Sequence, residues 1–187
     1  MIPTVNIVTG EVNSGKTTRM RALFRRTIAA DVILSEKIFD GGRFLGYRLV
    51  RLKSGEARTL ALCEEAYLGQ FAQACRLDRF VFSAEGLRFG IRTLERLCFN
   101  PAVGALFLDE VGPLELQGQG FAGVLPQLLR AEKELYITVR SSCLPEFLQK
   151  FEITEYRLIQ ESCNVDTVRI PPAPLQTTAI ISSPNIN

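Results

Sequence analysis

Residues 10–17 read GEVNSGKT and fit the pattern G-x-x-x-x-G-K-S/T of a phosphate-binding loop. The segment before them, TVNIV (4–8), is apolar enough for a buried strand, and an amphipathic helix is expected after them. A loop between such a strand and helix directs its backbone N–H groups at the phosphates of a nucleotide, at the positive end of the helix. The alternative is a glycine-rich turn that contains a lysine by chance, and the flanking strand and helix argue against it.

Two side chains of this loop have predicted contacts of their own. Lys16 reaches the β and γ phosphates, and the Thr17 hydroxyl ligates Mg²⁺. We therefore predict Lys16 as a catalytic residue and Thr17 as a metal ligand. The predicted nucleotide-binding residues are Gly10, Glu11, Val12, Asn13, Ser14, Gly15, Lys16, Thr17 and Thr18.

The helix predicted at 16–29 has one apolar stripe and one basic face. The stripe consists of Met20, Leu23, Phe24, Thr27 and Ile28, and the arginines off it are Arg19, Arg21, Arg25 and Arg26. Four arginines on a short helix could bind nucleic acid, but a solvated face is the better interpretation because the net charge of the chain is only +2. No basic stripe with interleaved aromatic residues is found, so a nucleic-acid partner is not expected.

Composition limits both the architecture and the chemistry. With 187 residues, of which 47% are hydrophobic and 22% charged, the chain is expected to form one globular domain at 1–170, followed by a Pro/Ser/Thr/Asn-rich tail at 171–187. The absence of histidine excludes Ser-His-Asp and Cys-His catalysis and every histidine-ligated metal site. Acid–base chemistry must come from carboxylates, lysine or tyrosine.

No secretory or membrane segment is expected. The first cation is Lys16, so no basic region opens the sequence, and no apolar run approaches the length of a membrane span. The five cysteines are scattered without C-x-x-C spacing, which favours reduced thiols. We therefore expect a cytoplasmic protein without a membrane partner.

The order of strand and helix signals predicts an α/β fold with a mainly parallel sheet. Strands are predicted at 4–8, 32–39, 43–51, 57–62, 80–83, 103–108, 135–139 and 156–159, and helices at 16–29, 86–98 and 119–131. The short connections Gly41-Gly42 and 53–56 leave no room for crossover helices, so 31–62 is predicted as an antiparallel meander at one edge of the sheet.

The later helices have apolar stripes as well. Helix 86–98 is expected to bury Leu87, Ile91, Leu94 and Cys98 and to carry Arg88, Arg92 and Arg96 on another face. This arginine row could hold transition-state charge, with Arg88 as the candidate, but a solvated face is the favoured interpretation. In helix 119–131, Pro126 predicts a kink or a start at that residue.

The segment ALFLDE (105–110) supplies the partner that a phosphate loop needs. Asp109, at the end of an apolar strand, is predicted to hold Mg²⁺ opposite Thr17, and Glu110 to polarise the attacking water. An acidic residue directly after the metal-binding aspartate is typical of hydrolytic P-loop ATPases with an extra strand between the two motifs. After the next predicted strand, Thr138, Arg140 and Ser141 are candidates to sense the γ-phosphate, and Arg140 is the preferred one.

Three segments together carry a resemblance: VTGEVNSGKTTRM (8–20), SEK (35–37) with GGRFLGYRLVRL (41–52), and LFLDEVGPLEL (106–116). Over residues 4–150 the chain resembles the THEP1-type P-loop nucleoside-triphosphatase family. The resemblance implies a three-layer P-loop sandwich and slow, Mg²⁺-dependent hydrolysis of ATP, GTP and other nucleoside triphosphates with little base selectivity.

The resemblance also assigns roles to individual residues. It places Gly10, Gly15, Lys16, Thr17 and Thr18 at the phosphates and the metal, and Asp109 and Glu110 at the catalytic positions. It gives Glu115 a role in stabilising the loop. Glu11, Val12 and Asn13 stand where the family usually has glycine or proline and a small residue, so Glu11 has to turn outward to be harmless.

Two other functions stay open from the residues alone. A nucleotide or small-molecule kinase needs an acceptor pocket and an arginine-rich lid, and no clear lid is found in the sequence. A nucleotide-operated binding module would hydrolyse slowly until a partner stimulates it.

Overall fold

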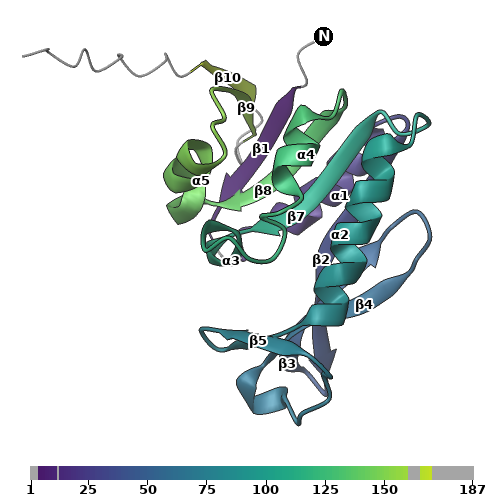
Figure 1. Ribbon diagram of the computed structural model, residues 1–187, viewed down its shortest axis with the longest axis vertical. Helices are drawn as coiled ribbons and strands as arrows, with labels where there is room; N and C mark the ends of the chain where they lie inside the picture. The colour runs from purple at the N-terminus through teal and green to yellow at the C-terminus, as the bar shows by residue number, and fades with distance from the viewer. Residues whose placement is uncertain (1–3, 12, 160–164, 170–187) are drawn as a thin grey trace, which may run out of the picture.

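The computed structural model describes residues 4–11, 13–159 and 165–169 (Figure 1). The predicted tail at 171–187 lies outside these residues. Within the described part, no helix is long and apolar enough to cross a membrane.

A single mixed sheet forms the centre of the fold, with strand order β10-β9-β1-β8-β7-β2-β3-β4-β6-β5. Its parallel part comprises β1 (Val5–Gly10), β2 (Ala30–Asp40), β7 (Ala105–Val111), β8 (Glu134–Arg140) and β9 (Glu155–Ile159). The antiparallel strands are β3 (Arg43–Arg51), β4 (Ala57–Cys63), β5 (Ala74–Leu77), β6 (Phe80–Ser83) and β10 (Val165–Arg169). The predicted parallel sheet with an antiparallel edge is confirmed.

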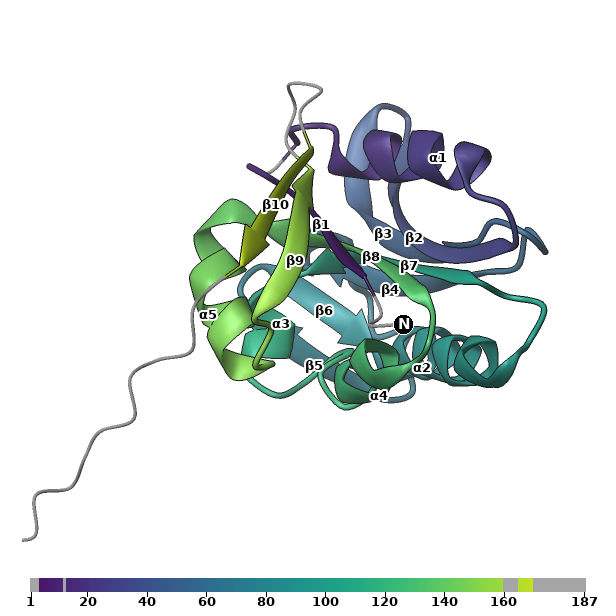
Figure 2. The same cartoon turned by 90° about the horizontal axis from the view of Figure 1, so that it is seen from above.

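Helices cover both faces of the parallel strands, so the predicted three layers are present (Figure 2). One face carries α1 (Lys16–Arg26), and the other carries α2 (Ala84–Phe99) and α4 (Leu125–Arg130). Two further short helices, α3 (Pro113–Leu116) and α5 (Leu144–Lys150), follow β7 and β8.

Alternation along the strands divides the apolar residues between two cores. In β1, Ile7 packs into the core under α2 and α4, whereas Val8 packs under α1. Phe107 of β7 lies in the core under α1, where Phe24 meets it edge-on at a centroid distance of 5.9 Å. The near-continuous apolar strands are therefore explained by burial on both faces.

The helix after the phosphate loop is shorter than its periodicity predicts. It ends at Arg26, and the Thr27 hydroxyl donates to Leu23 O at 2.9 Å. Ile28, predicted in the buried stripe, is instead 92% exposed because it follows the end of the helix.

The other two predicted helices differ in detail. On α2 the buried stripe is Gly86, Gly90, Thr93, Leu94 and Leu97, and the predicted Leu87, Ile91 and Cys98 are half-buried at its border. Glycine is required at Gly86, because a Cβ there would lie 2.1 Å from Thr59 O of β4. The helix predicted at 119–131 begins only at Leu125, and Pro126 lies in its first turn. Of the two predictions for this proline, a kink or a helix start, the helix start is confirmed to within one residue.

Candidate active site

The phosphate loop joins β1 to α1 and has the conformation that its glycines and asparagine permit. Asn13 and Gly15 have φ of 68° and 86°, in the left-handed region that both residue types tolerate. A Cβ at Gly10 would lie 2.4 Å from Ser14 Oγ, so a larger residue there would force the Ser14 side chain to move. The sequence therefore fixes a loop that curls around the start of α1.

Lys16 lies across this loop. Its Nζ donates to Gly10 O at 2.9 Å and to Glu11 O at 2.6 Å. Burial lowers the pKa of Lys16, and the carboxylates of Glu110 and Asp109 oppose that effect. From this position the Lys16 ammonium can donate hydrogen bonds to a polyphosphate without leaving the loop.

The unusual Glu11 of the loop turns away from the phosphate cavity. Its carboxylate accepts a hydrogen bond from the Ser141 hydroxyl, and it does not line the cavity. Asn13 is held by Lys37, whose Nζ donates to Asn13 Oδ1 at 2.7 Å. Val12 lies outside the described residues.

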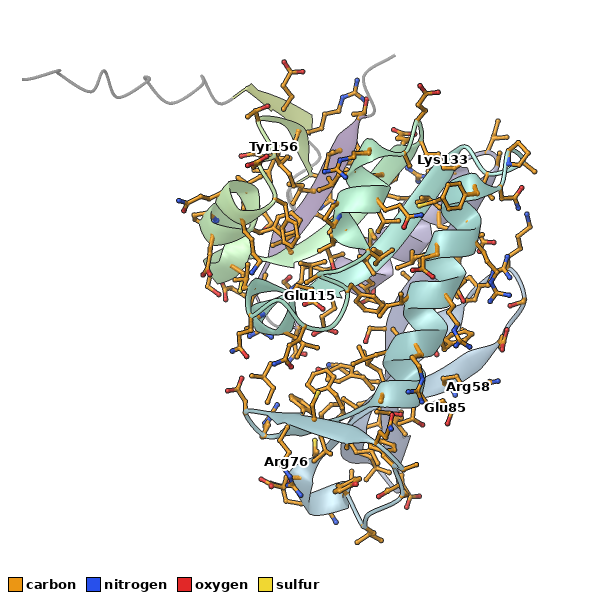
Figure 3. The ribbon with its side chains drawn as sticks, viewed as in Figure 1. Arg58, Arg76, Glu85, Glu115, Lys133 and Tyr156 are labelled. Atoms are coloured by element: carbon orange, nitrogen blue, oxygen red, sulfur yellow. The ribbon has the colours of Figure 1, made fainter. Side chains whose placement is uncertain are left out.

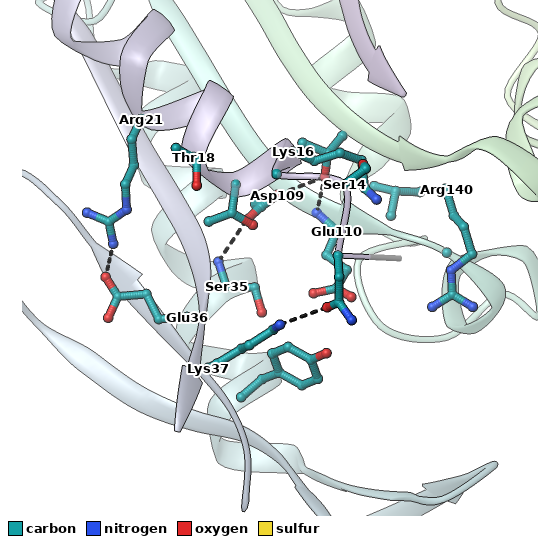
Figure 4. Close-up of a pocket in the computed structure, with 17 residues that line it drawn as sticks. Ser14, Lys16, Thr18, Arg21, Ser35, Glu36, Lys37, Asp109, Glu110 and Arg140 are labelled. Atoms are coloured by element: carbon teal, nitrogen blue, oxygen red, sulfur yellow. Dashed lines mark hydrogen bonds and ion pairs between the residues drawn. The ribbon is translucent and has the colours of Figure 1, made fainter. Parts of the chain in front are cut away.

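A cavity of about 400 Å³ lies in front of the loop (Figure 4). Of the predicted nucleotide-binding residues, those that line it are Asn13, Ser14, Gly15, Lys16, Thr17 and Thr18; Gly10 and Glu11 do not. Asp109, Glu110, Thr138 and Arg140 line the same cavity from β7 and β8. The structure thus brings the two predicted halves of the site together.

Asp109 is buried, and both of its carboxylate oxygens accept hydrogen bonds. Its Oδ2 accepts from Thr17 Oγ1 at 2.7 Å and from Ser35 N at 3.3 Å, and its Oδ1 accepts from Thr138 Oγ1 at 2.8 Å. Burial of this carboxyl, which is 2% exposed, raises its pKa, and these three donors together with Lys16 oppose the rise. A buried carboxylate with several donors is suited to a bound cation, whose charge would stabilise its ionised form.

Glu110 leaves the regular strand. One extra residue is inserted between Leu108 and Val111 relative to β8, and Glu110 has φ of 70°, which is uncommon for a residue with a Cβ. The Glu110 amide donates to Thr138 Oγ1 at 2.5 Å, which holds the bulge. As a result, the carboxylate lines the cavity rather than lying against the core.

The environment of Glu110 suits a base. Part of the side chain is open to the cavity, but the surrounding walls partly remove the carboxyl from water; this desolvation is the main cause that raises its pKa, and the neighbouring charge of Asp109 adds to it. The Ser35 side chain, Arg140 and Lys16 oppose the rise. A carboxylate with a raised pKa is a better proton acceptor than an ordinary glutamate.

Strand β8 lies between β1 and β7, so one strand separates the phosphate loop from the acidic pair. This is the arrangement expected for hydrolytic P-loop ATPases. Of the three candidates at the end of β8, Arg140 lines the cavity, Thr138 is bonded to Asp109 and Glu110, and Ser141 contacts Glu11. Thr138 is therefore a positioning residue.

The arginine row of α2 lies elsewhere. Arg88 is exposed and donates to Gln73 Oε1 at 3.0 Å, and Arg96 donates to Arg92 O at 3.2 Å. None of the three lines the phosphate cavity. The interpretation as a solvated face is confirmed for this row.

The donor set fits Mg²⁺. The oxygens of Thr17 and Asp109 lie side by side in the cavity, and both are hard ligands of the kind that Mg²⁺ prefers. Among the described residues there is no cluster of three or more His, Cys, Asp or Glu that could cage a metal.

Sequence reasoning missed several residues of the cavity wall, namely Arg21, Ser35, Glu36 and Tyr47. Arg21 of α1 pairs with Glu36 of β2, and Arg48 of β3 donates to the same carboxylate at 2.8 Å and 3.0 Å. One sequence signal could have identified Ser35 and Glu36. They follow the apolar residues Val32–Leu34 within one strand, and polar side chains in a buried strand need hydrogen-bond partners.

Glu115 supports the segment after Glu110. It lies at α3 and is 3% exposed (Figure 3), and its carboxylate accepts from Gly112 N at 2.9 Å and from Phe121 N at 3.1 Å. Burial raises its pKa to about 6. It does not line the phosphate cavity, as expected for a residue that stabilises the loop.

Comparison with known proteins agrees with this geometry. Residues 6–167 match the model of a family described as NTPase. The nucleoside-triphosphatase THEP1 of a Thermotoga species is 26% identical over 147 residues, which cover 78% of this chain and 79% of that protein. THEP1 of Pyrococcus abyssi is 28% identical over 145 residues, covering 75% and 76%.

Two solved structures share the fold. The crystal structure of THEP1 from Aquifex aeolicus has a TM-score of 0.63 at 16% identity, covering 90% of this chain and 91% of that one. The solution structure of a human cancer-related nucleoside triphosphatase has a TM-score of 0.58 at 20% identity, covering 84% and 87%.

Proposed function

Because this chain belongs to the NTPase family of nucleoside-triphosphatases, we propose that it hydrolyses ATP, GTP and other nucleoside 5′-triphosphates to the diphosphate and phosphate. We further propose that the reaction depends on Mg²⁺ and discriminates little between bases. The observation that carries this proposal is the convergence of Lys16, Thr17, Asp109 and Glu110 on one cavity.

The loop binds the substrate through its polyphosphate. Its backbone N–H groups face the phosphates, and Lys16 exchanges the Gly10 and Glu11 carbonyls for β and γ oxygens. The buried Ser14 hydroxyl has no hydrogen-bond partner among the described residues, and a phosphate oxygen would satisfy it.

Glu110 orients the attacking water and takes its proton. The bulge places its carboxylate in the cavity, and Thr138 keeps the backbone of Glu110 in that position. Mg²⁺, held by Thr17 and Asp109, would neutralise charge on the β and γ oxygens. Arg140, at the same end of the cavity as Glu110, places a positive charge near the phosphoryl group.

Low base selectivity is supported by the region beyond the loop. A shallow cavity of about 400 Å³ opens there and shares Ser14, Gly15, Lys16 and Thr18 with the phosphate cavity. Its remaining lining consists of Val8, Thr9, Arg19 and Ala22. These residues include no aromatic ring to stack on a base and no carboxamide to read its edge.

The direct test is release of free phosphate from ATP, GTP, CTP and UTP, with and without Mg²⁺. We expect the wild-type protein to release phosphate slowly from all four nucleotides, and only with Mg²⁺. The Lys16→Ala variant should neither release phosphate nor bind nucleotide. Glu110→Gln should lose release but keep binding. Release from a single nucleotide only, or equal rates without Mg²⁺, would contradict the proposal.

A further inference from the structure

A second cavity, of about 370 Å³, opens directly from the phosphate cavity. The two share Tyr47, Glu110, Gly112 and Arg140, so Glu110 lies at their junction. Unlike the first, the second cavity has mainly apolar walls, which include Leu60, Leu77, Phe80, Phe82, Leu87 and Phe121. Asp78, Arg79 and Glu115 also line it, so it is not apolar throughout. We refer to it as the apolar cavity.

Hydrolysis alone does not account for the apolar cavity. The attacking water needs only a place beside Glu110, and an apolar wall binds water poorly. A concave, largely apolar space of this size with a few polar groups at one end is typical of a small-molecule site. The cavity therefore has the size and lining of a site for a small organic molecule.

The nucleoside is not the best candidate for that occupant. Lys16 reaches the β and γ phosphates, so the γ-phosphate lies toward Asp109 and Glu110, and the nucleoside leaves the loop at the opposite end. Figure 4 shows Arg140 on the opposite side of the loop from Thr18 and Arg21. The shallow cavity includes Thr18 and so lies at the nucleoside end of the loop, whereas the apolar cavity includes Glu110 and Arg140 and so lies at the γ-phosphate end.

The polar groups at the junction indicate what the occupant presents to the γ-phosphate. A phosphate or carboxylate acceptor would be repelled by the Glu110 carboxylate, whereas a neutral hydroxyl can donate a hydrogen bond to it. Tyr47, Glu110 and Arg140 line both cavities, and Arg79 lines the apolar cavity beside them, so a carboxylate, a phenol and two guanidinium groups surround the junction. In an alcohol with an apolar body, the hydroxyl can donate a hydrogen bond to Glu110 at the junction, and the apolar body can pack against the cavity walls.

We propose that the apolar cavity is the acceptor site of a phosphotransferase, which binds a small alcohol with an apolar ring and transfers the γ-phosphoryl group to its hydroxyl. The proposal rests on the proposed function, because it uses the same phosphate site and the same base. Hydrolysis is then the reaction of water in the absence of the alcohol.

The chemical step is balanced. The hydroxyl oxygen forms a bond to the γ-phosphorus while the bond from that phosphorus to the β,γ-bridging oxygen breaks. Glu110 accepts the hydroxyl proton, and the nucleoside diphosphate leaves with the electron pair of the broken bond. The products are a phosphate monoester and the diphosphate, and no oxidant or further reactant is needed.

The experiment uses the full chain, Mg²⁺, ATP labelled on its γ-phosphate, and benzyl alcohol as the probe, because this alcohol has one apolar ring and one hydroxyl. We measure the ratio of labelled benzyl phosphate to labelled inorganic phosphate. In Leu87→Trp, which fills the apolar cavity, this ratio should fall about tenfold or more, the size of effect that one misfit in an apolar pocket produces. Leu77→Trp fills the cavity from strand β5 instead of helix α2 and serves if Leu87→Trp does not fold.

The matched control is Ile91→Trp. Ile91 lies one turn along α2 from Leu87, is equally half-buried and lines neither cavity, so the ratio should stay at the wild-type value. Release of inorganic phosphate without benzyl phosphate would overturn the acceptor site and leave the proposed hydrolysis intact. If the cavity-filling variants instead raise the KM for ATP, the cavity belongs to the nucleoside and the inference is wrong. Absence of both products would contradict the proposed function itself.

Discussion

The Thr138 hydroxyl of β8 donates a hydrogen bond of 2.8 Å to Asp109 Oδ1 at the end of β7. Thr138 Oγ1 also accepts a hydrogen bond from the Glu110 amide. The Thr138 side chain therefore holds both the buried Asp109 carboxylate and the bulge that places the Glu110 carboxylate in the cavity. Parallel pairing of β7 with β8 makes this contact possible, because the carboxyl ends of both strands meet at one edge of the sheet. The strand between the two motifs thus contributes directly to the site.

We expect Thr138→Val to lower turnover by about 10- to 100-fold, the range found when partners of metal-site ligands are removed. Valine has a similar shape but leaves Asp109 Oδ1 and the Glu110 amide without this partner. Phosphate release at saturating ATP, and its dependence on Mg²⁺ concentration, measure the effect. Thr138→Ser retains the hydroxyl and should stay close to wild type; equal losses in both variants would show that packing, not the hydroxyl, matters at this position.

Ionisation of Glu110 should determine how kcat falls as the pH is lowered, the acid limb of the pH–rate profile. Its carboxylate must be ionised to accept a proton, and its pKa is raised, so turnover should fall on acidification at a higher pH than an ordinary glutamate would give. Glu110→Gln should lower turnover by roughly 10²- to 10⁴-fold and remove this limb from the residual rate. Measurement of kcat against pH for both proteins tests this, and an unchanged limb in the variant would assign it to another group.

The close contact of α2 with β4 gives a prediction about stability. Gly86→Ala should destabilise the fold by about 1–3 kcal/mol, the usual cost of overpacking, because the new Cβ meets the Thr59 carbonyl. Gly123→Ala is the control, since a Cβ there has nothing within 4 Å. Urea unfolding compares the two variants with wild type. Equal stability of Gly86→Ala and wild type would mean that α2 can move away from β4 at no cost.

Much of the fold could be predicted because its signals are local. The loop GEVNSGKT specifies its own strand and helix, and the apolar runs separated by short turns specify the parallel sheet and the meander. The strands β5 and β10 and the helices α3 and α5 were missed. Each spans only four to seven residues, which gives a weak periodicity. Ile28 was misplaced because periodicity continues in the sequence after the helix has ended.

The site was predictable in its residue types but not in its shape. Lys16, Thr17, Asp109 and Glu110 follow from motifs, whereas the bulge at Glu110 has no local signal. The sequence predicts a strand that ends at Leu108, but β7 continues through the bulge to Val111. The hydroxyl of Thr138 forms the bulge contact from a strand that is distant in sequence. The apolar cavity is likewise assembled from segments of the meander, α2 and the region after β7, which only the folded sheet brings together.

Glu115 should make stability depend on pH in a direction opposite to that of most carboxylates. Its pKa rises from an ordinary 4.5 to about 6 in the folded protein, so between these values the folded state binds more protons than the unfolded one. Stability from this group is therefore present below pH 4.5 and lost as the pH rises through about 6. The loss amounts to roughly 2 kcal/mol for a shift of this size.

Glu115→Gln isolates this contribution. The amide keeps one acceptor for the N–H groups of Gly112 and Phe121 but turns an NH₂ toward the other, so the variant should be less stable by about 1–3 kcal/mol at low pH. Because glutamine does not titrate, the difference in unfolding free energy between wild type and variant should shrink as the pH rises from 4.5 to above 6. Urea unfolding across this range measures the difference, and a deficit that grows with pH would show that the ionised carboxylate is the form that the fold prefers.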